Sequence, residues 1–324
     1  MPSSTPPSVR TRPRDPLFSV VVPVFNEEAC VAELVSRVRK AFEGLRLELI
    51  LVNDGSSDRT LEMLQEKSES FADVHYLSFS RNFGHQPALA AGIEHAKGDA
   101  VISLDGDLQH PPELIPQLIE HWRQGYDIVY TVRVANEGHP LKEFVSRSFY
   151  QLLRWISGVD ISPGTADFRL LDRRAADALK SCEEHFIFIR GMVPWLGFSK
   201  LPVPYEAEPR HGGETKYLTG SMIRFALDGI FAFSTVPLRL ISLLGALTVG
   251  LGFLYGLYTL GVRLFTSQAE AGWTSLVVVI LIFSGAQMLS IGILSEYVGR
   301  IYEEVKSRPR YVIAEASPAM ENQP

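Results

Sequence analysis

Asp105 and Asp107 flank Gly106 directly after a short apolar run, and Gln109 follows two positions later. Two carboxylates at this spacing can bind a hard divalent cation through oxygen ligands, and Gln109 could add a side-chain oxygen. A cation that keeps some of its waters and also binds phosphate oxygens is Mg²⁺ or Mn²⁺. Because an isolated Asp-x-Asp is usually an ordinary acidic turn, the metal interpretation depends on where the fold places this segment.

Asp54 stands in a similar place, after an apolar run and before Gly55-Ser56. Asn-Asp-Gly-Ser is a good turn sequence, so Asp54 could serve the turn alone. An aspartate at the end of a strand can also accept hydrogen bonds from a nucleobase or a ribose. The residue types leave both interpretations open.

Two pairs of basic residues could bind phosphate groups. Arg133 ends a predicted strand and Arg147 lies in the polar segment after it, and paired arginines suit bidentate contacts with phosphate. Arg210 and Lys216 flank a glycine pair and could clamp a diphosphate, although the Gly-x4-Gly-Lys spacing of a Walker A loop is absent. Solvated surface charge is the alternative for each pair.

Asp167 lies between apolar neighbours in the segment Thr165–Arg169. A partly buried carboxylate close to a phosphate site is a candidate base or orienting group. The alternative is an ion pair between Asp167 and Arg169.

Apolar runs alternate with helical patterns from residue 18 to residue 132. This βαβα order predicts an α/β fold with a mostly parallel sheet and helices on both faces, whose ligands bind beyond the carboxyl ends of the strands. Polar clusters follow the first four predicted strands, at Asn26-Glu27, Asn53-Asp54, Arg81-Asn82 and Asp105/Asp107. Their convergence favours a metal site over an acidic turn. The predicted strands are Phe18–Phe25, Leu47–Val52, Val74–Phe79, Ala100–Leu104 and Ile128–Val132, and the predicted helices are Glu28–Phe42, Thr60–Lys67, Pro87–Ala96 and Pro112–Arg123.

Two stretches of 23 uncharged residues, Leu240–Val262 and Trp273–Ser295, stand near the end of the chain. Each would span roughly 34 Å as a helix, enough for a hydrocarbon core of about 30 Å. Only ten residues join them, so they predict a transmembrane hairpin over 240–295. A pair of buried core helices is the alternative, but buried helices are seldom so long and so uniformly apolar.

Basic residues flank the outer ends of both stretches, whereas the joining loop holds only Arg263. The positive-inside rule therefore predicts a multi-pass protein of the cytoplasmic membrane with both termini and the large N-terminal domain on the cytoplasmic face. Residues 218–239 mix apolar and charged side chains and predict interfacial helices, with a surface helix packed on the domain as the alternative. Residues 1–17 are proline-rich and predict a disordered tail, and residues 296–324 predict a cytoplasmic tail.

The composition excludes several classes of protein. A net charge of −6 gives no support to nucleic-acid binding, and two widely separated cysteines match neither a disulfide framework nor a zinc site. The eight histidines show no metal-ligand spacing. Neither a G-x-S-x-G elbow nor a G-x-G-x-x-G loop is present, which argues against a hydrolase and a dehydrogenase.

Seven short segments, in this order, carry a family resemblance: Val21–Glu28, Val52–Asp58, Arg81–Gly84, Leu104–Pro112, Ala166–Leu170, Gly213–Tyr217 and Glu296–Tyr302. Together they resemble a family 2 glycosyltransferase of GT-A fold. Within that family they are similar to the polyprenyl-phosphate glycosyltransferases, namely the dolichol-phosphate mannose synthases and the bactoprenol glucosyltransferases. The two-span tail looks more like the latter, and the GT-A domain would cover residues 18–217.

The resemblance implies a role for each matching residue. Asp105, Asp107 and Gln109 would hold the metal and the donor diphosphate, and Asp167 would match the proposed catalytic base. Asn53, Gly106 and Thr215 depart mildly from residues common among relatives, which bears on the donor and leaves the reaction class intact. The other implied roles are nucleotide binding by Pro23, Phe25, Glu27 and Asp54, donor binding at Gly106, contact with the diphosphates by Arg210 and Lys216, and binding of the lipid phosphate by Arg133 and Arg147.

The implied activity is inverting transfer of a sugar from a nucleotide-sugar donor to a polyprenyl phosphate such as undecaprenyl or dolichyl phosphate. UDP-glucose is the first choice of donor and GDP-mannose the second, and the resemblance also suggests a homo-oligomer, a tetramer. The alternatives are an inactive membrane-anchored module that binds sugar nucleotides, a processive polysaccharide synthase and a small transporter. Gln151–Trp155 fits the Q-x-x-R-W pattern of processive enzymes, but it precedes Asp167 where those enzymes have it after the catalytic carboxylate. The spans lack the intramembrane charge of a transporter.

Overall fold

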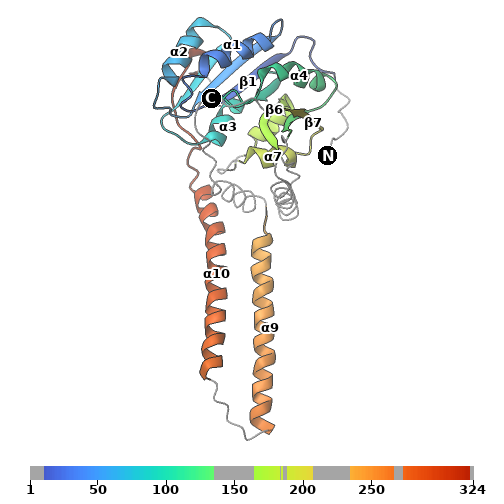
Figure 1. The fold of residues 1–324 in the computed structure, drawn as a ribbon, viewed down its shortest axis with the longest axis vertical. Helices are drawn as coiled ribbons and strands as arrows, with labels where there is room; N and C mark the ends of the chain where they lie inside the picture. Colours follow the sequence, from blue (N-terminus) through green and yellow to red (C-terminus); the bar gives the residue numbers. More distant parts are fainter. Residues whose placement is uncertain are drawn as a thin grey trace.

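The predicted alternation of strands and helices builds one mixed sheet in this computed structural model (Figure 1). The structure describes residues 11–134, 164–182, 184, 188–206, 234–265 and 273–321. Within these residues the sheet has eight strands in the order β7-β5-β6-β4-β1-β2-β3-β8. The strands are β1 (Leu17–Val24), β2 (Arg46–Asn53), β3 (Val74–Phe79), β4 (Ala100–Ser103), β5 (Ile128–Arg133), β6 (Thr165–Asp172), β7 (Lys200–Tyr205) and β8 (Ile313–Ala316).

The α/β architecture is confirmed, and the five predicted strands correspond to β1 to β5 with each end within one residue. Strands β4, β1, β2 and β3 pair in parallel, as successive βαβ units require. Three further strands, β6, β7 and β8, were not predicted. Strand β6 is antiparallel to both of its neighbours and β8 is antiparallel to β3, so the sheet is more mixed than the sequence indicated.

The reversed direction of β6 brings distant residues to one edge of the sheet. Ser103, at the end of β4, pairs with Arg169 in β6, so the first residues of β6 lie beside the carboxyl end of β4. Strand β5 ends at the same edge, where Arg133 pairs with Tyr205 at the end of β7. The edge therefore collects the carboxyl ends of six strands and the amino ends of β6 and β8.

Helices cover both faces of the sheet, and a buried apolar cluster fills the space on each face. Helix α1 buries Val31, Leu34, Val35 and Val38, the i, i+3, i+4, i+7 pattern of an amphipathic helix. Helices α1, α2 and α4 pack on one face, whereas α3, α6 and α7 pack on the other. The helices of this domain are α1 (Val31–Ala41), α2 (Thr60–Ser70), α3 (His85–His95), the 3-10 helix η1 (Pro112–Leu114), α4 (Ile115–Arg123), α6 (Arg173–Lys180), α7 (Ile189–Trp195) and α11 (Pro318–Glu321).

Two long helices, α9 (Val236–Phe265) and α10 (Trp273–Val305), extend side by side away from the sheet domain (Figure 1). Both apolar stretches lie within them, and at 1.5 Å per residue the helices are roughly 45 and 50 Å long. Among the described residues, one helical stretch, Val236–Tyr258, has the length and composition to cross a membrane, with a mean hydropathy of 2.0 and none of it buried. Residues 218–233 of the predicted interfacial segment lie outside the described part of the chain.

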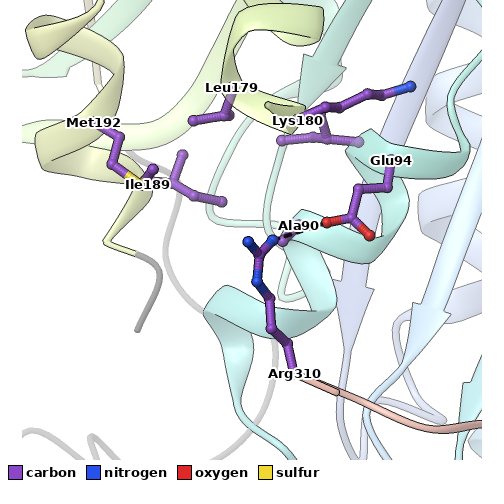
Figure 2. Close-up of a pocket in the computed structure, with 8 residues that line it drawn as sticks. Ala90, Glu94, Leu179, Lys180, Ile189, Met192 and Arg310 are labelled. Atoms are coloured by element: carbon purple, nitrogen blue, oxygen red, sulfur yellow. Dashed lines mark hydrogen bonds and ion pairs between the residues drawn. The ribbon is translucent and has the colours of Figure 1, made fainter. Parts of the chain in front are cut away.

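After α10 the chain returns to the sheet, whereas the sequence had suggested only a tail. Strand β8 pairs with β3, and Arg310 Nη1 lies 3.1 Å from Glu94 Oε1 near the end of α3. The Tyr311 hydroxyl donates to the same carboxylate, and its ring stacks on Phe79 at 4.9 Å. Figure 2 shows Arg310 facing Glu94 beside a small pocket between α3, α6 and α7. This pocket lies toward the end of α3, away from the edge that gathers the polar clusters.

The N-terminal segment also differs from the prediction, because Arg12 is anchored on the domain and Leu17 already belongs to β1. The Arg12 guanidinium forms ion pairs with Asp172 and, at 3.3 Å, with Asp127, and it donates to the carbonyl oxygens of Trp122 at 3.1 Å and Tyr126 at 2.9 Å. Its side chain is 9% exposed. Arg12 thus neutralises the buried carboxylates of Asp127 and Asp172, although the composition of its segment predicted disorder. Residues 1–10 lie outside the described part.

Replacement of Arg12 by alanine should destabilise the fold, because Asp127 and Asp172 would lose a charged partner while they remain buried. We expect a loss of about 1.5–3 kcal/mol in the free energy of unfolding, the value of a hydrogen-bonded charged group. Thermal unfolding of the full chain in detergent would measure the loss. The matched variant is Arg14→Ala, since Arg14 is exposed and its replacement should change stability by less than about 0.5 kcal/mol. Equal effects of the two variants would contradict the anchoring role of Arg12.

Candidate functional site

The structure brings the four predicted polar clusters to the carboxyl edge of the sheet. Hydrogen bonds tie the loop after β1 to the loop after β2. Asn26 Oδ1 accepts from Ser57 N at 2.8 Å, and Glu27 N donates to Thr60 Oγ1 at 3.0 Å. Asn53 Nδ2 donates to Ser78 Oγ of β3 at 2.9 Å. These hydrogen bonds connect the loops after β1 and β2 and tie the end of β2 to β3.

A tight turn follows β4 and carries the predicted metal ligands. Asp107 Oδ1 accepts a hydrogen bond from Gln109 N at 3.1 Å. Leu108, between these residues, has a φ of 60°, a left-handed conformation that is unfavourable for a branched side chain. Backbone strain of this kind persists only where the surrounding structure enforces it, and it gathers at functional sites.

Gly106 lies where this turn passes the end of β1. A Cβ atom here would lie 2.8 Å from Val24 Cγ1 and 3.0 Å from the carbonyl oxygen of Pro23. The position therefore accepts glycine because two backbone segments approach closely. Donor binding at Gly106 stays a prediction.

His110 fixes the first aspartate of the turn. The Asp105 N–H donates to His110 Nδ1 at 3.1 Å, and the imidazole stacks on Phe168 of β6 at 5.5 Å. The Tyr205 ring packs edge-on to His110 at 5.8 Å. A neutral His110 whose Nδ1 accepts this hydrogen bond carries its proton on Nε2.

The Asp105 carboxylate is arranged to take a further partner. Its Oδ1 atom is buried and accepts no hydrogen bond from the described residues, and His85 Nε2 lies 3.4 Å away. A buried oxygen without a hydrogen bond is costly unless another group compensates it. Asp107 lies in the same turn, and this all-oxygen pair fits Mg²⁺ or Mn²⁺.

Asp167 is a fully buried carboxylate held by two arginines. Its Oδ1 accepts from Arg169 Nη2 at 2.5 Å, and its Oδ2 accepts from Arg190 Nε at 2.9 Å and lies 2.7 Å from Arg190 Nη2. Burial opposes ionisation, but Arg190, a hydrogen bond from His85 and Arg169 together hold the pKa of Asp167 well below its usual range. Asp167 is therefore an ionised group with both oxygens bound. The alternative pairing with Arg169 is present in the structure.

His85 begins α3 and lies between the carboxylates of Asp105 and Asp167. Its Nε2 is 3.4 Å from Asp105 Oδ1 and 3.5 Å from Asp167 Oδ2. Burial lowers the pKa of His85, but the hydrogen bond to Asp167 and the charge of Asp105 outweigh it, so the pKa is raised overall. Ligand atoms of all three residues lie within 4.8 Å of one another. Because both oxygens of Asp167 are bound to arginines, a cation fits Asp105 and Asp107 better than this trio.

Asp54 organises the neighbouring loop. Its Oδ1 accepts from Phe83 N at 2.7 Å and its Oδ2 accepts from Gly84 N at 2.9 Å. Burial raises the pKa of Asp54, although these backbone hydrogen bonds work in the opposite direction. The turn-forming role is thus present in the structure. Contact of Asp54 with a nucleotide stays a prediction.

Three of the four residues that the resemblance implies in nucleotide binding lie at the end of β1, and the fourth is Asp54. Pro23 is inside the strand, Phe25 is 37% exposed at the rim, and the Glu27 carbonyl oxygen accepts from Cys30 N at 2.9 Å as α1 begins. An exposed aromatic ring at a sheet edge offers a surface for a planar base. Their binding roles stay predictions.

Arg133 is exposed at the end of β5, where it pairs with Tyr205 at the end of β7. Burial and the nearby Asp105 and Asp107 raise the pKa of Tyr205 to about 12, against the effect of Arg133. Arg133 thus lies beside Tyr205, whose ring packs on His110 next to the acidic turn. Arg147, Arg210 and Lys216 lie outside the described residues, so their phosphate contacts stay predictions.

Sequence reasoning missed four residues of this edge: His85, His110, Arg190 and Tyr205. The two histidines were treated as ordinary surface or core residues because no metal-ligand spacing connects them. Arg190 and Tyr205 stand far along the sequence from the acidic turn, and only the fold brings Arg190 to Asp167 and Tyr205 to His110. The signal available was that His85 and His110 directly adjoin the RNFG and LDGDLQ segments.

Two family models match the chain. Residues 19–179 match the glycosyl transferase family 2, which covers β1 to β6 and most of α6. Residues 236–301 match the GtrB C-terminal hairpin, which covers α9 and most of α10.

Curated relatives match nearly the whole chain. An uncharacterized glycosyltransferase YkcC of Bacillus subtilis is 44% identical, over 91% of this chain and 93% of the relative. A prophage bactoprenol glucosyl transferase homolog of Escherichia coli is 40% identical, over 91% and 98%. The bactoprenol glucosyl transferase of Shigella phage SfII is 40% identical, over 91% and 97%. Among solved structures, glucosyl-3-phosphoglycerate synthase of Mycobacterium tuberculosis is 20% identical over 68% of this chain and 80% of that chain, with a TM-score of 0.48.

The close approach of Gly106 to Val24 can be tested by substitution. Gly106→Ala should lower the free energy of unfolding by about 1–3 kcal/mol, because the new methyl group overlaps Val24. Val24→Ala removes that methyl contact, so the double variant should be more stable than the sum of the single effects by about 0.5 kcal/mol or more. Denaturation of the wild type and the three variants gives the coupling. Strictly additive effects would contradict the close approach.

Proposed function

Since the chain belongs to glycosyl transferase family 2, we propose that this glycosyltransferase moves a sugar from a nucleotide diphosphate donor to a polyprenyl phosphate at a membrane. UDP-glucose is the proposed donor, and polyprenyl-phosphate glucose is the proposed product. The bactoprenol glucosyl transferases that match this chain support the lipid acceptor, because the match includes both the sheet domain and the hairpin.

One observation carries the proposal: the same chain contains an acidic site at the edge of its sheet and an exposed apolar hairpin. A soluble sugar nucleotide and a lipid acceptor meet only where a donor site lies beside a bilayer. We propose that the hairpin crosses the cytoplasmic membrane and that residues 18–217 work on its cytoplasmic face, which the flanking arginines support.

The acidic turn forms the proposed donor site. Asp105 and Asp107, with Gln109 next to them, would hold Mg²⁺ or Mn²⁺, and the buried Asp105 Oδ1 is the oxygen that lacks a hydrogen bond among the described residues. When bound, the cation would offset the negative charge of the diphosphate leaving group. His110 accepts a hydrogen bond from the Asp105 N–H and so fixes the backbone there. Because Gly106 has no side chain, the turn can pack closely against the end of β1.

The acceptor phosphate attacks the anomeric carbon in line with the leaving nucleoside diphosphate, which inverts the configuration. A phosphate monoester has a second pKa of about 6, so it is largely dianionic at neutral pH and needs no base to become a nucleophile. We therefore assign Asp167 a positioning role: it holds Arg190 and His85 in place beside the donor edge. Arg133 would contact phosphate groups, and so would Arg147, Arg210 and Lys216, which lie outside the residues that the structure describes.

The test is the transfer of labelled sugar into the lipid phase. Membranes with the full chain receive undecaprenyl phosphate and, separately, UDP-glucose, other UDP-sugars or GDP-mannose, with Mg²⁺ or Mn²⁺. We expect lipid-linked product from UDP-glucose that disappears with a chelator. Asp107→Asn should lower the rate by roughly 10²-fold or more, as expected for loss of an electrostatic group at a leaving group.

The control is Glu43→Gln, which removes the same charge from an exposed position away from the edge and should keep the wild-type rate. No lipid-linked product with any donor would overturn the proposed function. An Asp107→Asn variant as active as Glu43→Gln would overturn the proposed role of the acidic turn.

A further inference from the structure

Helix α7 ends in an aromatic side chain that the sheet domain leaves uncovered. Trp195 is 64% exposed. In the described part of the domain, the other exposed large apolar residues are Phe25, Val134 and Val312, at 37%, 47% and 46%. Figure 1 places α7 at the end of the domain from which α9 and α10 extend. Helix α7, which ends at Trp195, therefore lies at the hairpin end of the domain.

The same helix reaches the candidate site at its other end. Arg190, its second residue, binds Asp167, and five residues later the helix ends at Trp195, a rise of about 7.5 Å. Ile189, Met192 and Val193 bury the inner face of α7 in the apolar cluster beneath the sheet. Because this face is packed, α7 holds Trp195 at a set distance from Arg190.

Two features of this end favour a lipid surface over a protein partner. An indole ring combines an apolar body with an N–H donor, and tryptophan is enriched where hydrocarbon meets lipid headgroups. Phe198 follows Trp195 by three residues, and the guanidinium of the exposed Arg174 lies 5.4 Å from the centre of its ring. Arg174 thereby supplies a positive charge that anionic headgroups attract. Figure 1 shows that α9, which holds the exposed apolar stretch Val236–Tyr258, begins at the same end of the domain as α7.

We propose that Trp195 inserts into the membrane interface and that α7 thereby sets the height of Asp167 and Arg190 above the bilayer. This inference rests on the membrane location in the proposed function. An acceptor phosphate at headgroup level would then lie within about the length of α7 from Arg190. Helix α7 would be the element that connects the lipid surface to the site.

Fluorescence quenching tests the position of Trp195. The full chain is reconstituted in vesicles of phosphatidylcholine and phosphatidylglycerol, with or without lipids that carry a nitroxide near the headgroup. The chain has four tryptophans, so the difference between wild type and Trp195→Phe isolates one of them. We expect this component to be quenched by the labelled lipid. A component that only aqueous iodide quenches, or that neither agent quenches because a second copy of the chain covers it, would overturn the proposal.

Kinetics test the consequence. Trp195→Gln should raise KM for polyprenyl phosphate in vesicles by about fivefold and leave KM for the sugar nucleotide unchanged, whereas Trp195→Phe should restore most of the loss because it keeps an apolar ring. Equal changes in both KM values would contradict a lipid-contact role. If the wild type makes no lipid-linked product, the proposed function fails, and the quenching experiment still decides whether Trp195 meets the bilayer.

Discussion

The organisation of the candidate site depends on the compensation of one buried charge. Asp167 has no exposure to solvent, so its ionised form survives only because Arg169 and Arg190 bind its two oxygens. Removal of either arginine would leave an uncompensated charge in the interior, which is strongly unfavourable. The ion-pair group also crosses elements, because Arg169 belongs to β6 and Arg190 to α7. One carboxylate thereby fixes α7 against the sheet edge and holds His85 between itself and Asp105.

A contrast between two carboxylates follows from this arrangement. The oxygens of Asp167 are fully bound, whereas Asp105 keeps a buried oxygen that accepts no hydrogen bond from the described residues. His85 faces both of them. The charges at this edge are therefore balanced in two ways. Arginines of the protein neutralise the inner carboxylate of Asp167, whereas we propose that a cation and a diphosphate bind at the outer acidic turn. This division agrees with a reaction whose nucleophile is already ionised and whose leaving group needs charge neutralisation.

The sequence predicted the parts of this structure that local pattern determines. Strands β1 to β5 are β-branched or apolar runs between turn residues, and the acidic turn is recognisable because Asp105 and Asp107 are neighbours in sequence. Strand β6 escaped prediction because it carries Asp167 and Arg169, charges that a buried strand tolerates only when they pair. Strand β7 contains two prolines and lies at an edge of the sheet, where proline is accepted. The roles of Arg190 and His85 depend on their tertiary contacts with Asp167, and their spacing along the sequence does not predict those contacts.

The measurement that tests this account most directly is the protonation state of Asp167 in the reconstituted full chain. Infrared difference spectra between wild type and Asp167→Asn, with Asp167→Glu as a folded comparison that keeps the charge, identify the bands of this carboxyl group. A carboxylate with a pKa held well below its usual range stays ionised as the pH rises from about 5 to about 8, so its ionised band should persist unchanged. A protonated carboxyl band that titrates within this range would contradict the account, because Asp167 would then be an acid–base group and not a bound, ionised anchor.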